Sequence, residues 1–312
     1  VPCLVHLFGS KNLLFTFFFS YFRNLLKERI CFSRKKVPTM QSNNIPSKMT
    51  QLFFARYPKV NILKWFVDKK SNRRFSKLIY KILYWLILKP FNRIELIGKD
   101  NINTLKEPFL IVENHIAGLD VLIHLSIWAH LGKSTFTLVW VGNYMQPALY
   151  RMLMFSEMIV KHGDGKKLVQ QMVDRLKKGD IVNIFPEGTF PGGIFQGTGL
   201  AQKGFTGAAR VAFEYEKQTR KKLIIVPVAT TGTNYAYPPK ERAKRYPCAK
   251  IKVFFGKPFH VSFKSSDFVK EEIEEKTDEI MHRIADLIGQ KRLIPNYQRR
   301  WYSERSIKSR KF

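Results

Sequence analysis

The fold is decided by the stretch FLIVENHIAGLDVLIHLSIWAH, residues 109–130. Its first four residues form a short apolar run, which is typical of a strand that is buried on both faces of a sheet. A turn around His115 follows, and from about Asp120 to His130 we expect a helix. A buried strand that passes through a turn into a helix is the building unit of an α/β domain.

The same alternation continues outward from this stretch in both directions. Further elements are expected along the chain, the strands at residues 94–98, 135–141, 181–185, 223–228 and 251–255 and the helices at residues 166–178, 204–213 and 272–288. This order predicts an α/β fold with a mixed, mostly parallel central sheet that is flanked by helices.

The turn after residues 109–112 carries a histidine and a carboxylate five positions apart, His115 and Asp120. Transfer of an acyl group to a hydroxyl needs a base, and a neutral imidazole suits this role near neutral pH. A carboxylate that accepts the other ring N–H fixes the tautomer and stabilises the imidazolium. Because residues five apart on a continuous helix point about 140° apart, the pair works best if His115 precedes the helix and Asp120 begins it.

Spacing alone leaves other interpretations of these residues open. His115 by itself is compatible with a buried, hydrogen-bonded histidine, and Asp120 with an ordinary residue at a helix N-terminus. His124 and His130 raise the further alternative of a metal site with Asp120. No larger cluster of ligands accompanies them in the sequence, so we expect no metal.

A second motif, residues 185–189, leaves an apolar strand through a turn that contains Gly188. Backbone N–H groups in such a turn suit a phosphate or an oxyanion, and Glu187 can bind a hydroxyl or a cationic neighbour. A glycine-rich segment follows and ends near Lys203. A glycine-rich segment with a cation at its end predicts a ligand-binding loop. The motif alone is equally compatible with an ordinary turn.

In this order, the motifs resemble those of the glycerolipid acyltransferase family, the enzymes that acylate glycerol phosphate and lysophospholipids. Asn114 and His115 with Asp120 are similar to the family's first motif, which is of the HX4D type. Residues 185–189 are similar to its third motif and residues 226–228 to its fourth.

The resemblance implies a glycerol-3-phosphate acyltransferase-like fold with a catalytic pair, in which His115 is the general base and Asp120 orients it. It implies acceptor-side binding by Glu187, Gly188 and Thr189. The implied reaction moves an acyl group from acyl-CoA or acyl carrier protein to the hydroxyl of a lysophospholipid such as 1-acylglycerol-3-phosphate, in phospholipid biosynthesis. No metal or other cofactor is implied.

Two departures from the family pattern concern the acceptor phosphate. Phe190 stands where the third motif usually continues with an arginine that clamps the phosphate. Lys161 stands near the position where the second motif usually ends in arginine. We therefore expect Lys161 first, or else Lys203 or the backbone N–H groups of the Gly188 turn, to bind the phosphate. The alternative is that the acceptor is not lysophosphatidate. The departures also leave open an alternative function, a catalytically altered lipid-surface binding protein of the same fold.

The charge of the chain implies an anionic partner, because 54 Lys+Arg against 24 Asp+Glu give a net charge of +30. Residues 72–89 place an apolar stripe beside cations such as Lys77 and Lys81. This pattern favours peripheral attachment to an anionic membrane surface, on a cytoplasmic face, with a core-packed helix as the alternative. No nucleic-acid motif accompanies the charge, so no nucleic-acid partner is expected.

These features divide the chain into four parts. Residues 1–48 are an N-terminal extension for which three interpretations stay open: a signal peptide, an interfacial segment, or a non-native or disordered extension. Residues 49–92 are a membrane-associating helical segment. Residues 93–290 form the acyltransferase domain that the resemblance implies, and residues 291–312 are a basic tail.

Overall fold

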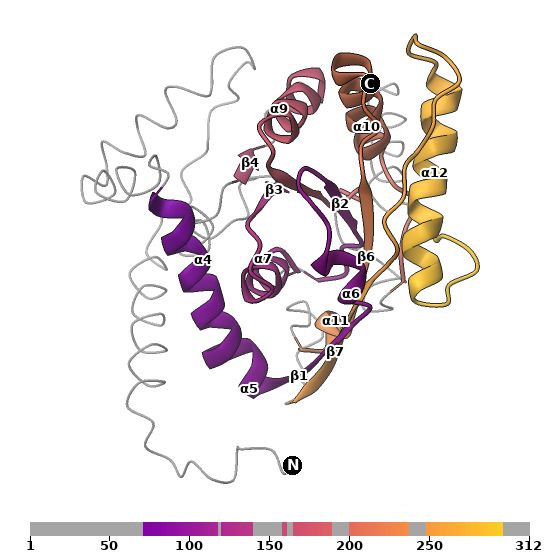
Figure 1. The fold of residues 1–312 in the computed structure, drawn as a ribbon. Coiled ribbons are helices and arrows are strands. Elements are labelled where there is room, and N and C mark those ends of the chain that lie inside the picture. The colour runs from indigo at the N-terminus through magenta and orange to yellow at the C-terminus, as the bar shows by residue number, and fades with distance from the viewer. Residues whose placement is uncertain are drawn as a thin grey trace, which may run out of the picture. The chain divides into compact units, whose positions relative to one another are not determined.

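A computed structural model describes residues 71–117, 120–139, 158–160, 165–188, 200–236 and 248–295. Within these residues, seven strands form one sheet in the order β1-β7-β6-β2-β5-β3-β4 (Figure 1). The strands are β1 (Asn92–Ile97), β2 (Leu110–Glu113), β3 (Thr135–Val139), β4 (Met158–Val160), β5 (Ile181–Ile184), β6 (Ile225–Thr231) and β7 (Ala249–Phe255).

The pairing of these strands confirms the predicted mixed, mostly parallel sheet. Among the described strands, all neighbours run parallel except β6 and β7, which are antiparallel. β2 lies between β5 and β6, so the centre of the sheet is parallel. Because carboxyl ends of parallel strands share one edge, the turns that follow β2 and β5 lie next to each other.

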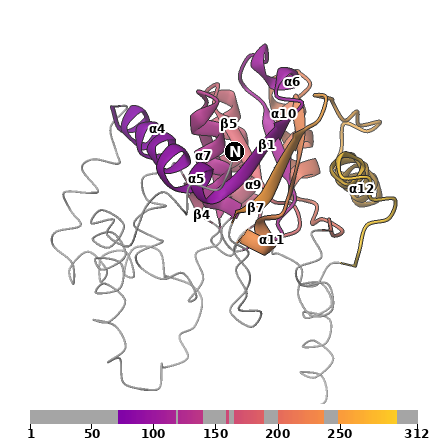
Figure 2. The same cartoon turned by 90° about the horizontal axis from the view of Figure 1, so that it is seen from below.

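Helices cover both faces of this sheet (Figures 1 and 2). The described helical elements are α4 (Ser71–Leu83), the π-helix η2 (Tyr84–Leu88), α5 (Lys89–Phe91), α6 (Asp100–Asn103), α7 (Asp120–His130), α9 (Gly165–Lys177), α10 (Gly207–Thr219), α11 (Thr233–Ala236) and α12 (Lys270–Leu287). One layer holds α9, α10 and α12, and the other holds η2 and α7.

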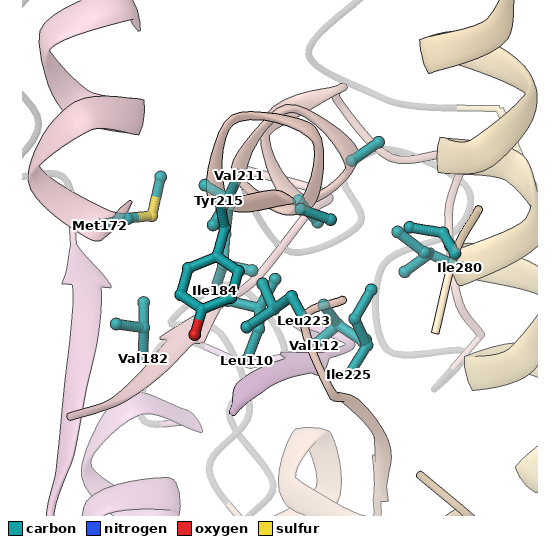
Figure 3. Close-up of a cluster of buried hydrophobic side chains, with 14 of the residues drawn as sticks. Leu110, Val112, Met172, Val182, Ile184, Val211, Tyr215, Leu223, Ile225 and Ile280 are labelled. Carbon is teal, nitrogen blue, oxygen red and sulfur yellow. The ribbon is translucent and has the colours of Figure 1, made fainter. Parts of the chain in front are cut away.

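The strand β2 shows how the sequence supports two layers at once, since all four of its residues are buried. Leu110 and Val112 pack in the cluster beneath α9, α10 and α12. Figure 3 shows these two side chains in that cluster together with Met172 and Ile280 from the covering helices. Ile111 points the other way and joins the cluster that includes α7. This alternation follows from the period of two in a strand.

The helix expected around the apolar stripe of residues 72–89 is confirmed as α4, which continues into the single π-helical turn η2. Of the side chains described here, residues 76–88, the buried ones are spaced four apart: Tyr80, Tyr84 and Leu88. The large apolar side chains on its exposed face are Leu78, Ile82, Trp85 and Leu86. No helix among the described residues is long and apolar enough to cross a membrane.

The structure shifts several predicted boundaries. The helix expected at residues 204–213 runs instead from Gly207 to Thr219, and it ends where Arg220 takes a left-handed conformation with φ 58°. No glycine marks this end in the sequence, which is why the helix was predicted too short. The helices α6 and α11 were not predicted, because four residues are too few to display a helical period.

Candidate active site

The predicted pair of His115 and Asp120 forms at the carboxyl end of β2. His115 lies in the turn after the strand and Asp120 is the first residue of α7, so the turn folds the two side chains together. His115 Nδ1 lies 2.9 Å from Asp120 Oδ2. The carboxylate is almost fully buried, whereas 15% of the histidine side chain is exposed. The buried carboxylate of Asp120 therefore holds the imidazole, and part of the imidazole remains exposed to solvent.

The carboxylate of Asp120 is itself held in place by the backbone of the same turn. Its Oδ2 accepts hydrogen bonds from the backbone N–H of Ile116 at 2.6 Å and of Ala117 at 2.7 Å. The backbone N–H of Asp120 donates back to the Ala117 carbonyl at 3.1 Å. The oxygen that faces His115 thus has a fixed position, because a charge-assisted bond from a backbone N–H is short and directional.

Glu187 joins the turn after β5 to the turn after β2. Its Oε2 accepts the backbone N–H of His115 at 2.6 Å, and its Oε1 accepts the backbone N–H of Gln202 at 2.7 Å. The side chain is completely buried. The structure therefore shows Glu187 as a brace on the backbone of the histidine, and its predicted contact with the acceptor stays a prediction.

Burial has a strong electrostatic effect on Glu187. Desolvation raises the pKa of its carboxyl to about 8, against the lowering effect of the hydrogen bonds from Gln202 and His115. The nearby negative charge of Asp120 raises the pKa further. The desolvation effect is the larger one because the group has no exposed surface over which water could stabilise its charge.

Asn114 has a structural role that was not predicted from the sequence. Its Nδ2 donates to the Thr230 carbonyl at 3.0 Å, and its Oδ1 accepts the Thr230 N–H at 2.7 Å. Asn114 thereby ties the turn after β2 to β6 and fixes the residue that directly precedes His115. The signal in the sequence was a side-chain amide directly after a buried strand, which can bond the neighbouring strand where the ladder stops.

The other predicted binding residues are less fully described. Gly188 is exposed and has φ +74°, a left-handed conformation that favours glycine in this turn. Lys203 is exposed, and its backbone N–H donates to the Ile294 carbonyl at 2.9 Å. Lys161, Thr189 and Phe190 lie outside the described residues.

The histidines of the metal alternative have other partners. His124 Nδ1 lies 2.5 Å from Glu113 Oε2. The ring of His130 stacks on Tyr84 with centroids 4.1 Å apart. Among the described residues, no group of three or more His, Cys, Asp or Glu side chains is placed to hold a metal ion.

Comparison with protein families and curated sequences finds one consistent relationship. Residues 93–231 match the family model described as Acyltransferase. The chain is 28% identical over 214 residues to the chloroplastic 1-acyl-sn-glycerol-3-phosphate acyltransferase LPAT1 of Arabidopsis thaliana, covering 67% of this chain and 55% of the relative. It is 28% identical over 124 residues to the chloroplastic 1-acyl-sn-glycerol-3-phosphate acyltransferase BAT2 of Brassica napus, covering 38% and 35%. The chain thus spans about half or less of the length of these relatives.

A solved structure shares the fold. It is the crystal structure of the 1-acyl-sn-glycerophosphate (LPA) acyltransferase PlsC from Thermotoga maritima, with a TM-score of 0.52 and 16% sequence identity. The similarity covers 80% of this chain and 98% of that one. At this level of identity the comparison supports the sheet and its helical layers.

Proposed function

We propose that this chain, which belongs to the acyltransferase family through its residues 93–231, transfers an acyl group to the hydroxyl of a lysophospholipid. The observation that carries the proposal is the bond of 2.9 Å between His115 Nδ1 and Asp120 Oδ2. With the proton on Nδ1, the lone pair of the imidazole lies on Nε2. This is the tautomer that a general base needs.

The reaction follows from this geometry. His115 Nε2 takes the proton of the acceptor hydroxyl as the hydroxyl oxygen attacks the carbonyl carbon of an acyl thioester. The new C–O bond forms and the C–S bond breaks, and the thiolate that leaves takes the proton back from the imidazolium. Asp120 stabilises the imidazolium between these two steps, since its carboxylate accepts the hydrogen bond that Nδ1–H donates.

The substrates are proposed from the resemblance and from the names of the relatives. We propose 1-acylglycerol-3-phosphate as the acceptor, because both plant relatives are named for acylating it. The donor is acyl-CoA or acyl carrier protein, and no cofactor takes part. The turn of Glu187, Gly188 and Thr189 is proposed to face the acceptor, with Lys161 or Lys203 in place of the missing arginine.

The surface of α4 and η2 supports attachment to a membrane. Leu78 is 53% exposed and Leu86 is 68% exposed, on a helix that also carries Lys77 and Lys81. Lys89 lies over the ring of the exposed Trp85, 3.9 Å from its centroid. An apolar stripe beside cations suits an interface with anionic lipids. The cytoplasmic face stays a prediction, and the two plant relatives are named as chloroplastic.

Membranes that contain the full chain test the proposal with a labelled acyl-CoA, a labelled acyl carrier protein and a panel of lysophospholipids. We expect transfer by the wild type, and a loss of about 10²–10⁴-fold in kcat in His115→Ala. Ser126→Ala is the control, because the Ser126 hydroxyl donates to the Leu122 carbonyl of its own helix.

The same assay decides between the enzyme and the lipid-surface binding protein. A binding protein of this fold would bind vesicles that contain the lysophospholipid while transferring no acyl group from either donor. Equal transfer by the wild type and His115→Ala would remove His115 from the mechanism.

A further inference from the structure

A second buried histidine–carboxylate pair lies beneath the first. Glu113 is the last residue of β2, and His124 lies one turn beyond Asp120 on α7. His124 Nδ1 is 2.5 Å from Glu113 Oε2, and the side chains are 0% and 4% exposed. His124 Nε2 lies 3.3 Å from Thr135 Oγ1. Both side chains are almost fully buried.

The buried pair of Glu113 and His124, which we call the inner pair, repeats the arrangement of His115 and Asp120, which we call the outer pair. Residues 113 and 115 are two apart along the chain leaving β2, and residues 120 and 124 are one helical turn apart on α7. Each pair therefore joins α7 either to the end of β2 or to the turn that follows it, with the acid on β2 in the inner pair and on α7 in the outer pair. The ring of Phe185 lies beside both imidazoles, 4.9 Å from His115 and 6.0 Å from His124 between centroids.

Both members of the inner pair have a further hydrogen-bond partner. Glu113 Oε1 accepts the hydroxyl of Thr230 at 2.6 Å, so both carboxylate oxygens have a partner. Through Thr230 and Thr135 the network reaches β6 and β3 as well as β2 and α7. Polar groups in such a place must keep their partners, because a buried group that loses one is costly. The hydrogen-bond network therefore restricts the position of α7 relative to β2.

We propose that Glu113 and His124 are positioning residues for acyl transfer, which set α7 against β2 so that Asp120 Oδ2 meets His115 Nδ1. This inference rests on the proposed function. A displacement of α7 by a fraction of a helical turn would separate the outer pair, while the fold could remain. A shift of about 1 Å at a reacting group costs on the order of 10²-fold in rate.

The first test asks whether bonding is what matters. Glu113→Gln keeps an acceptor for His124 and a polar partner for Thr230, so we expect its kcat to stay within about threefold of the wild type. Glu113→Leu and His124→Leu remove the bonds at similar volume, and we expect kcat to fall by about 10–100-fold with both KM values unchanged. Ser126→Ala on the same helix is the matched control. An unchanged kcat in both leucine variants would overturn the inference.

A mutant cycle separates positioning from loss of folded protein. If Glu113 acts through the outer pair, Glu113→Leu causes no further loss of kcat in an Asp120→Asn background. A role in stability alone would lower kcat by the same factor in both backgrounds, and this additive result would overturn the inference. Should the leucine variants fail to fold, Thr135→Val, which removes only the bond to His124 Nε2, takes their place in the cycle.

A spectroscopic arm keeps the inference distinct from the proposed function. In the full chain with ¹⁵N-labelled histidine, the Nδ1–H signal of His115, assigned by its loss in His115→Ala, reports the bond to Asp120. We expect Glu113→Leu to shift this signal and Glu113→Gln to preserve it. A wild type that transfers no acyl group contradicts the proposed function, and the NMR result still decides whether the inner pair positions the outer one.

Discussion

At the scale of single residues, we expect the buried carboxyl of Glu187 to make the free energy of unfolding depend on pH. Its pKa of about 8 lies above the ordinary value of 4.5. Between these two pH values the folded chain binds more protons at this site than the unfolded chain. The contribution of Glu187 to the free energy of unfolding therefore falls as pH rises through this window, by up to about 1.4 kcal/mol per pH unit.

The side chain at position 187 cannot titrate in Glu187→Gln. As pH rises from 5 to 8, we therefore expect the free energy of unfolding of this variant to increase relative to that of the wild type. Urea unfolding of both proteins at each pH measures the difference, which cancels the titration of other groups. Parallel stability curves would show that Glu187 is ionised in the folded protein throughout this range.

A second question at the residue scale concerns the phosphate of the proposed acceptor, because Phe190 stands where the family usually has arginine. A neutral aromatic ring cannot hold a phosphate dianion in a bidentate bond, so another cation would have to bind it, or none does. We expect Lys161→Ala to raise the KM for 1-acylglycerol-3-phosphate by about tenfold and the KM for the donor little.

Phe190→Arg should favour this acceptor over lysophospholipids that carry a headgroup. Steady-state kinetics with both acceptor classes checks the two variants. If neither variant changes the preference, Lys203 or the backbone N–H groups of the Gly188 turn become the site to examine.

At the scale of elements, the exposed stripe of α4 and η2 is the feature to test. We expect Leu78→Glu with Leu86→Glu to weaken binding to anionic vesicles by at least about tenfold, because each buried leucine contributes roughly 1.5–3 kcal/mol. Sedimentation with vesicles measures the partition. Phe268→Glu is the control, since Phe268 is also exposed, at 46%, but lies beside Phe213 on the other helical layer. Equal binding by all variants would place the membrane contact elsewhere.

At the scale of the whole molecule, we expect the net charge of +30 to favour association with anionic surfaces. We expect binding to anionic vesicles to weaken strongly between about 50 mM and 500 mM NaCl, because salt screens exposed charges over this range. Vesicles of neutral lipid should bind far less at low salt. A competition between duplex DNA and anionic vesicles at both salt concentrations checks the absence of a nucleic-acid partner, and a preference for the duplex would contradict it.

The sequence by itself determined the features that depend on local patterns. The apolar run of residues 109–112 predicted β2, and the following segment predicted α7, because burial and period are properties of neighbouring residues. The spacing of His115 and Asp120 left several interpretations open, and it was the resemblance to the acyltransferase motifs that implied the pair, which the structure brings within 2.9 Å. The alternation of elements predicted a mixed, mostly parallel sheet.

Only the tertiary structure decided which distant residues meet. Glu187 reaches the backbone of His115 across 72 residues because β5 lies next to β2, and the order of strands in a sheet leaves no trace in the local pattern. For the same reason neither the antiparallel pairing of β6 with β7 nor the pairing of Glu113 with His124 was predicted. The apolar stripe of α4 was visible in the sequence. Which of its faces is exposed was decided by tertiary packing, because the side chains that pack against α7 and the sheet are the buried ones.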